Sequence, residues 1–201
     1  MIHDVDASLS ALLAAEALNG TEAEVLFDAP TKDWAARRNS PTVDVFLYDI
    51  REDVSRRDQM AQPVRGADGR VVGREPPPRR FKLSYLLTVW TRRPEDEHRL
   101  LAQLLTTLVR YDRIPDAHLR GELAGQPLPV ILNLALPPTQ DRSLSDIWGA
   151  LGGELKPSID LVAIAPLDAG RTRQAGPPVL EQPHVRLVRS DRPGGAAAEE
   201  R

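Results

Sequence analysis

Hydrophobic residues recur at helical spacing in two long segments of the chain. The first segment, residues 4–18, places one apolar stripe on a helix, and the stripe comprises Val5, Leu9, Leu12 and Leu13. We expect Asp4 or Asp6 to cap this helix and Asn19-Gly20 to end it. The second helix begins at Pro94, has acids in its first turn, and carries paired rows of leucine that predict firm packing on a sheet.

Other segments have the composition or the alternation of β-strands. The clearest is FKLSYLLTVW, residues 81–90, where every second residue from Phe81 to Val89 is apolar. Strands are also expected at residues 25–27, 42–50, 128–136 and 158–165, and a short helix at 143–151. We expect 42–50 to be a central strand whose Asp44 and Asp49, an odd number of residues apart, point to opposite faces.

The order of these elements predicts an α/β (α+β) fold. It runs helix, strand, strand, long arm, strand, helix, strand, helix, strand, which indicates a mixed β-sheet of about four to five strands packed by helices. We expect a single domain over residues 1–180. Residues 181–201 form a tail rich in Pro, Gly, Ala and Arg, which we expect to be largely disordered.

Residues 51–80 form the arm between two predicted strands and differ in character from their surroundings. They contain no aromatic residue, four prolines and eight arginines against five acids, a net charge of +3, whereas residues 1–50 carry −6. A mobile loop fits this composition. A hairpin that turns at Asp68-Gly69 before Val71-Val72 fits it equally well.

Composition narrows the classes of function. The chain has 201 residues, of which 41% are hydrophobic and 27% charged, and a formal net charge of −3, which is typical of a soluble globular protein and unlike a dedicated nucleic-acid binder. The absence of cysteine excludes disulfides, thiol nucleophiles and Cys-ligated zinc. The first residues of the chain include Asp4 and Asp6, where a signal peptide carries basic residues. No run of apolar residues approaches the length of a membrane-spanning helix.

No catalytic motif emerges from the sequence. The loop glycines lack the spacing of a phosphate-binding loop, GxSxG is absent, and the four histidines are scattered. Glu95 and His98 match only one half of a di-iron motif. We therefore expect no catalytic residue, no cofactor and no metal. Trp34 lies in a polar segment, as either a local core residue or an interface anchor.

Long segments of the chain resemble a known family. They are DVDASL at 4–9, FDAPTKDWAARR at 27–38, PTVDVFLYDIRED at 41–53, RRFKLSYLLTVWTRRPEDEHRLL at 79–101 and LGGELKPSIDLVAIAP at 151–166. Together they resemble the N-terminal domain family of the cap, or tail-terminator, proteins of phage-tail-like contractile injection systems. The resemblance implies a tail-terminator-like fold and a structural role without enzyme activity. It implies a homohexameric ring on the distal end of the inner tube, which stops tube growth and joins the tube to the last sheath layer.

The resemblance also sets expectations for partners and contact residues. The expected partners are further copies of the chain, the inner tube protein and the sheath protein, with no nucleic acid and no membrane; the expected location is the cytoplasm, within the particle. Candidate protein-interface residues are Lys32, Trp34, Arg37, Arg38, Arg56, Arg57, Arg74, Arg79 and Arg80. The nearest alternative is a baseplate or tube-adaptor subunit of the same particle. Alternatives of other classes are a small enzyme with an unrecognised site and nucleic-acid binding through the arginine-rich arm.

Overall fold

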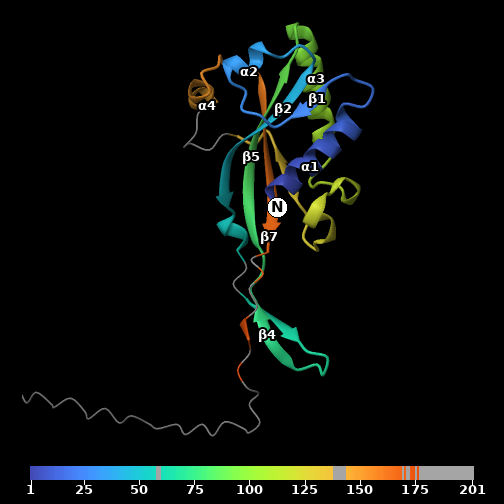
Figure 1. The fold of residues 1–201 in the computed structure, drawn as a ribbon, viewed down its shortest axis with the longest axis vertical. Coiled ribbons are helices and arrows are strands. Elements are labelled where there is room, and N and C mark those ends of the chain that lie inside the picture. The colour runs from blue at the N-terminus through green and yellow to red at the C-terminus, as the bar shows by residue number, and fades with distance from the viewer. Residues whose placement is uncertain (58–59, 138–143, 169, 171–172, 175, 177–201) are drawn as a thin grey trace, which may run out of the picture.

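A computed structural model describes residues 1–57, 60–137, 144–168, 170, 173–174 and 176. Its body is a five-stranded sheet in the order β1-β2-β5-β7-β6, built from β1 (Glu24–Leu26), β2 (Thr42–Glu52), β5 (Arg79–Trp90), β6 (Ile131–Leu134) and β7 (Ser158–Leu167). Only β1 and β2 are parallel; the other neighbouring strands are antiparallel. The predicted mixed sheet of four to five strands packed by helices is confirmed (Figure 1).

One face of the sheet carries the main hydrophobic core. Helix α1 (Ile2–Leu12), the π-helical turn η1 (Leu13–Ala17) and helix α3 (Pro94–Leu108) pack on this face. Two 3-10 turns, η3 (Asp116–His118) and η4 (Gly121–Gly125), close its far side against α1. The predicted stripe on α1 and one of the two rows predicted on α3 supply this core, because Leu9, Leu12, Leu104 and Leu108 are buried. The second row predicted on α3 is not buried, since Leu105 is 43% exposed and Val109 is 70% exposed.

The start of α1 differs from the prediction. The helix begins at Ile2 after Met1, so neither Asp4 nor Asp6 is its cap. Asp4 lies one turn inside, where its carboxylate is 3.0 Å from the N-terminal ammonium group. Asp6 accepts a hydrogen bond of 2.7 Å from the hydroxyl of Tyr85 on β5, so both acids tie the helix to its surroundings.

The opposite face of the sheet is covered only at one end. Helices α2 (Lys32–Ala36) and α4 (Leu144–Ala150) lie there, at the end of the body away from the arm (Figure 1). Beneath them the three tryptophans of the chain meet: the ring centroids of Trp34 and Trp90 are 5.5 Å apart, and those of Trp90 and Trp148 are 6.4 Å apart. These contacts form a second, aromatic core.

A β-bulge in β2 overturns one prediction about side-chain direction. The register with β5 pairs Asp44 with Thr88 and Asp49 with Ser84, and the shift between them leaves Tyr48 as an extra residue. Thr88 and Ser84 point to the same face, since they are four residues apart on one strand. Asp44 and Asp49 therefore share a face, and the predicted opposite orientation is wrong because a bulge reverses the alternation.

Residues 51–80 form a hairpin arm. After the 3-10 turn η2 (Val54–Arg56), strands β3 (Gln62–Arg65) and β4 (Val71–Glu75) pair antiparallel, and β8 (Arg173–Gln174) adds a third strand beside β4. Gly69 takes a positive φ of 78° at the tip, as the expected Asp-Gly turn requires. In Figure 1 the arm projects from the body beyond the ends of β5 and β7.

Candidate functional site

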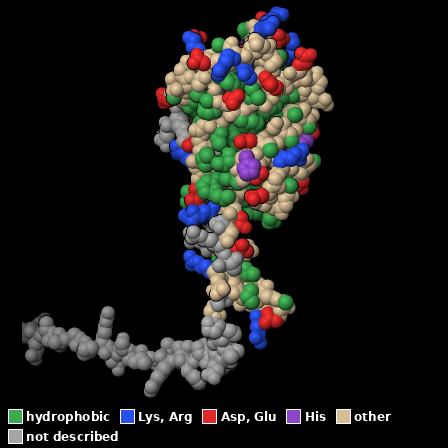
Figure 2. Space-filling model, in the orientation of Figure 1, with side chains coloured by type: hydrophobic (Ala, Val, Ile, Leu, Met, Phe, Trp, Pro, Cys, Tyr) green, Lys and Arg blue, Asp and Glu red, His purple; other side chains and the backbone are tan. Residues whose placement is uncertain are grey.

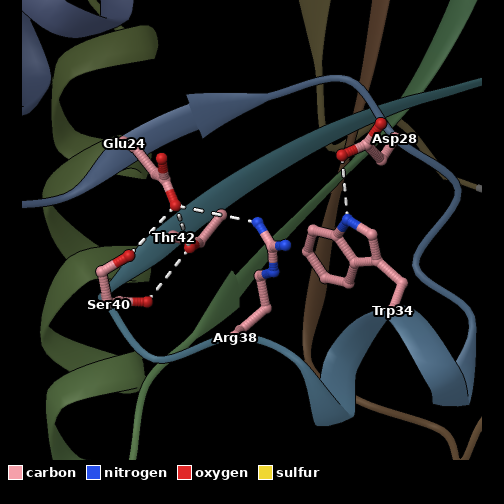
Figure 3. A network of polar contacts seen from close by, with 6 residues as sticks. All are labelled: Glu24, Asp28, Trp34, Arg38, Ser40 and Thr42. Atoms are coloured by element: carbon pink, nitrogen blue, oxygen red, sulfur yellow. Dashed lines mark hydrogen bonds and ion pairs between the residues drawn. The ribbon is translucent and has the colours of Figure 1, made fainter.

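Two residues that precede α2, Asp28 and Thr31, hold Trp34 of this helix by hydrogen bonds; Figure 3 shows the bond to Asp28. Thr31 caps the helix, because its hydroxyl accepts a hydrogen bond of 3.2 Å from the Trp34 main-chain N–H. The indole Nε1 of Trp34 donates to Asp28 at 2.9 Å. Trp34 is only 5% exposed and packs edge-on against Trp90, so it takes the local-core position of the two that the sequence leaves open.

Arg38 lies over the exposed side of this aromatic core. Its guanidinium carbon is 5.1 Å from the centroid of Trp34, within the range of a cation–π contact. The same group lies 3.9 Å from the Glu24 carboxylate, which also accepts hydrogen bonds from Ser40 and Thr42 (Figure 3). Glu24 thereby orders the turn into β2 and holds Arg38 in place.

Asp44 is buried directly beneath this segment. It is fully inaccessible to solvent, and neither of its carboxylate oxygens makes a well-formed hydrogen bond within the described part of the chain. Burial raises its pKa to about 8, and the Asp28 carboxylate adds to that rise. The Asp28 main chain and the Arg38 guanidinium oppose the rise only in part, so Asp44 is protonated at neutral pH.

The base of the arm holds a compact network of charges. Glu52 lies 3.4 Å from Arg57 and 3.8 Å from Arg79. Asp53, only 2% exposed, lies 3.7 Å from Arg56 and 3.3 Å from Lys82. This network joins the end of β2 and turn η2 to the start of β5.

Asp53 is held in its charged form at this position. Burial alone would raise the pKa of its carboxyl, but the hydrogen bond from Ser55 and the cations Lys82 and Arg56 together hold the pKa below its usual range. The network therefore fixes the direction in which the arm leaves the body.

The structure separates the predicted contact residues into two groups. Near α2, Lys32 and Arg37 are exposed and Arg38 is partly exposed. At the arm, Arg74 is exposed on β4, Arg80 is partly exposed at the start of β5, and the remaining arginines join the network above. The groups stand at opposite ends of β2, whose eleven residues span about 33 Å.

A hollow that the sequence did not indicate lies on the α4 face of the sheet. It has a volume of about 390 Å³, and within its lining the Tyr48 hydroxyl donates a hydrogen bond of 2.7 Å to Asp160. Lys82 and Asp49 line its side, and Asp49 lies 3.1 Å from Arg51. The bulge in β2 brings these groups together, and bulges carry no clear signal in a single sequence.

In the described ranges, no three His, Asp or Glu side chains cluster as metal ligands do. No helix in the same part of the chain is long and apolar enough to cross a bilayer.

Comparison with known proteins identifies the family. The Pvc16 N-terminal domain matches residues 4–181. The chain belongs to the Pvc16 N-terminal domain family. No curated protein matches the sequence.

Two solved structures share the fold of this Pvc16 N-terminal domain. One is the sheath/tube terminator of PVC, an extracellular contractile injection system, in the extended state, with 22% identity and a TM-score of 0.69. It is matched over 94% of this chain and 65% of its own. The other is the tube terminating cap of the anti-feeding prophage AFP, with 20% identity, a TM-score of 0.62, and coverage of 92% and 62%. The chain thus spans less than two thirds of either terminator.

Proposed function

We propose that this chain is a structural cap that ends the inner tube of a contractile injection particle. The family match over residues 4–181 carries the proposal, and the fold shared with a sheath/tube terminator and a tube terminating cap supports it. In this role six copies form a ring on the distal end of the tube. The ring contacts the tube protein on one side and the last sheath layer on the other, and the role requires no catalytic group.

The physical argument for a cap rests on the ends of a polymer. A tube built from head-to-tail contacts always leaves one unsatisfied surface, so it grows until a subunit that does not reproduce that surface covers it. A cap therefore needs two unlike ends. This chain has them: the α2 end is closed by helices over three tryptophans, and the other end extends into the arm (Figure 1).

The two groups of basic residues are the proposed contact surfaces. Lys32, Arg37 and Arg38 present cations at the α2 end. At the arm end the proposed contacts are Arg56, Arg57, Arg74, Arg79 and Arg80. Several of these cations already pair with Glu24, Glu52 or Asp53, whereas Lys32, Arg37 and Arg74 are exposed. Exposed cations suit docking on acidic surfaces of neighbouring subunits, tube or sheath, because complementary charge steers encounter and fixes register. We propose that assembly takes place in the cytoplasm and that the cap stays with the particle.

The test is removal of the protein from particle-producing cells, with the length of tubes and sheaths measured by electron microscopy. We expect overlong tubes of variable length, or tubes without sheath, and normal length after the gene is restored. Particles of unchanged length with intact ends would overturn the proposal. Imaging the labelled chain on intact particles separates the cap from a baseplate or tube adaptor, because the adaptor would lie at the opposite end.

A further inference from the structure

A hollow lies at the α2 end of the body, between the turn into β2 and the start of α3. It has a volume of about 510 Å³, which is within the size range of pockets that bind ligands. Ala35 and the partly exposed Trp90 line its apolar part. Its cationic part is lined by Arg38, Arg92 and Arg93. We call it the arginine hollow.

The guanidinium group of Arg38 is fixed in place but makes no hydrogen bond within the described part of the chain. It lies over the ring of Trp34, and its distance of 3.9 Å from the Glu24 carboxylate is too long for a hydrogen bond (Figure 3). Only Nε is fully buried, so both Nη groups remain accessible. A guanidinium group binds a carboxylate through two parallel, charge-assisted hydrogen bonds. Arg38 is therefore already positioned to receive an anion.

The charges around the hollow leave one cation without a partner. Each acid beside its arginines already lies next to a cation, and the pairs are Glu24 with Arg38 at 3.9 Å, Glu95 with Arg93 at 3.6 Å and Asp96 with Arg99 at 3.1 Å. Arg92 is exposed between β5 and α3, and within the described ranges it has neither an ion pair nor a hydrogen bond. Figure 2 shows Lys and Arg side chains mixed with Asp and Glu side chains at this upper end of the body.

The small excess of positive charge indicates which kind of ligand fits. One unpaired cation, together with the free donors of Arg38, matches a single carboxylate, because complementary charge gives a site its specificity. A nucleic acid requires a broad basic surface, and the acids at this end of the body would repel its phosphates. The apolar part of the hollow, at Ala35 and Trp90, suits a hydrophobic side chain next to the carboxylate. These features fit an acidic segment of a protein chain.

We propose that the arginine hollow binds an acidic side chain of another protein of the particle. Arg38 donates hydrogen bonds to the carboxylate, and the unpaired charge of Arg92 attracts it. The inference rests on the proposed cap function, in which the α2 end is one of two unlike ends and meets a protein other than the cap. It adds Arg92, which belongs to neither group of basic residues named above, to the contact residues at this end.

The small number of lysines in the chain allows a direct test. Arg92→Lys keeps the positive charge and introduces an amine, which a zero-length carbodiimide joins to a carboxylate in contact with it. Particles that carry this variant are treated with the carbodiimide, and cross-linked peptides are identified by mass spectrometry. We expect the introduced amine to be joined to Asp or Glu of a different protein.

Arg110→Lys is the matched control for the cross-linking. Arg110 is also an exposed arginine, but it lies at the opposite end of α3, whose fifteen residues span about 22 Å. We expect no cross-link to another protein from this position. If Arg92→Lys gives a cross-link only within the chain or to a second copy, or gives none in particles of normal length, the inference is wrong.

A binding measurement tests the same residues without cross-linking. Purified protein is added to particles from cells that lack it, and the bound fraction is measured by sedimentation at increasing protein concentration. We expect Arg38→Gln and Arg92→Gln each to bind at least fivefold more weakly, and Arg110→Gln to bind as the wild type does. Arg38→Lys should also bind more weakly, because an ammonium group cannot form the two parallel hydrogen bonds of a guanidinium group.

Two outcomes separate this inference from the proposed function. Circular dichroism first confirms that each variant is folded, and Arg92→Gln removes a side chain without a polar partner in the described part of the chain. Normal binding of both Gln variants would overturn the binding of a carboxylate in the hollow and leave the cap function intact. Failure of the wild-type protein itself to bind these particles would instead contradict the cap function.

Discussion

Asp44 offers the sharpest test of the energetics of the fold, through the substitution Asp44→Asn. Its carboxyl is buried with a pKa of about 8, against 3.8 for an exposed aspartate. Well below pH 3.8 the group is protonated in both the folded and the unfolded chain, and it then has no effect on stability. As the pH rises from about 3 to 8 the unfolded chain loses this proton while the folded chain keeps it, so the folded state loses stability.

The loss of folding stability at high pH can be calculated from the rise in the pKa of Asp44. Each pKa unit corresponds to 1.36 kcal/mol, so a shift of about four units sets an upper limit of about 6 kcal/mol at pH 8 and above. The folded protein relaxes around the charged carboxylate, so the loss of stability is smaller than this upper limit. We expect the charged carboxylate to lower the free energy of unfolding by about 2 kcal/mol or more. Asn has nearly the same shape and does not titrate. Asp44→Asn should therefore match the wild type near pH 3 and exceed its stability at pH 8.5.

The assay is urea unfolding at pH 3 and pH 8.5, followed by tryptophan fluorescence. The signal is suited to the question, because Trp34 and Trp90 lie in the aromatic core on the same face as Asp44. Asp116→Asn is the control, since Asp116 is exposed on η3 and far from this core. A difference between Asp44→Asn and wild type that is equal at both pH values would refute the reasoning.

Three further predictions concern single positions. Gly121→Ala should destabilise the fold by about 2–4 kcal/mol, since φ is +58° and a Cβ would overlap the Asp4 carboxylate; Gly125→Ala, where the space is open, is the control in thermal unfolding. Asp53→Asn should lower stability at pH 7 but not at pH 2, because a carboxyl with a lowered pKa stabilises only above that pKa, and urea unfolding at both pH values checks this. Trp148→Ala, at a side chain 1% exposed, should cost about 3–5 kcal/mol in urea unfolding.

The spacing of hydrophobic residues was sufficient to predict most helices and strands of the body. Strand 81–90 and the helix from Pro94 were predictable because alternation and helical spacing report which residues face the core, and Leu83 to Val89 on the strand and Leu104 and Leu108 on the helix are buried. The predicted strand 128–136 is shorter in the structure, Ile131–Leu134, since Ala135 has a positive φ of 48° that breaks the extended conformation. Alanine is not typical of positions with a positive φ, unlike glycine or asparagine, so the sequence does not predict this turn.

The candidate surfaces were less predictable, because they depend on contacts between distant segments. The sequence marks Arg56, Arg57 and Arg79 as candidate interface residues but does not show their partners, and in the structure each lies beside Glu52 or Asp53. The ion pairs at the base of the arm join β2 and η2 to the start of β5, which are separated in sequence, so no window of the chain contains them. The meeting of the three tryptophans requires β5, α2 and α4 to converge, and only the folded topology specifies that.

The main core lies in the body, and the arm stands apart from it. At the α2 end helices cover both faces of the sheet, whereas at the arm end Ile50, on the core face, is 47% exposed. Among the described elements, β3 and β4 make extensive contacts only with each other and, for β4, with β8. The arm can therefore open without disturbing the core of the body. Replacing residues 62–75 by a Gly-Ser turn should leave the thermal unfolding of the body unchanged. A transition well below that of the wild type would show that the arm does stabilise the body, and would refute this independence.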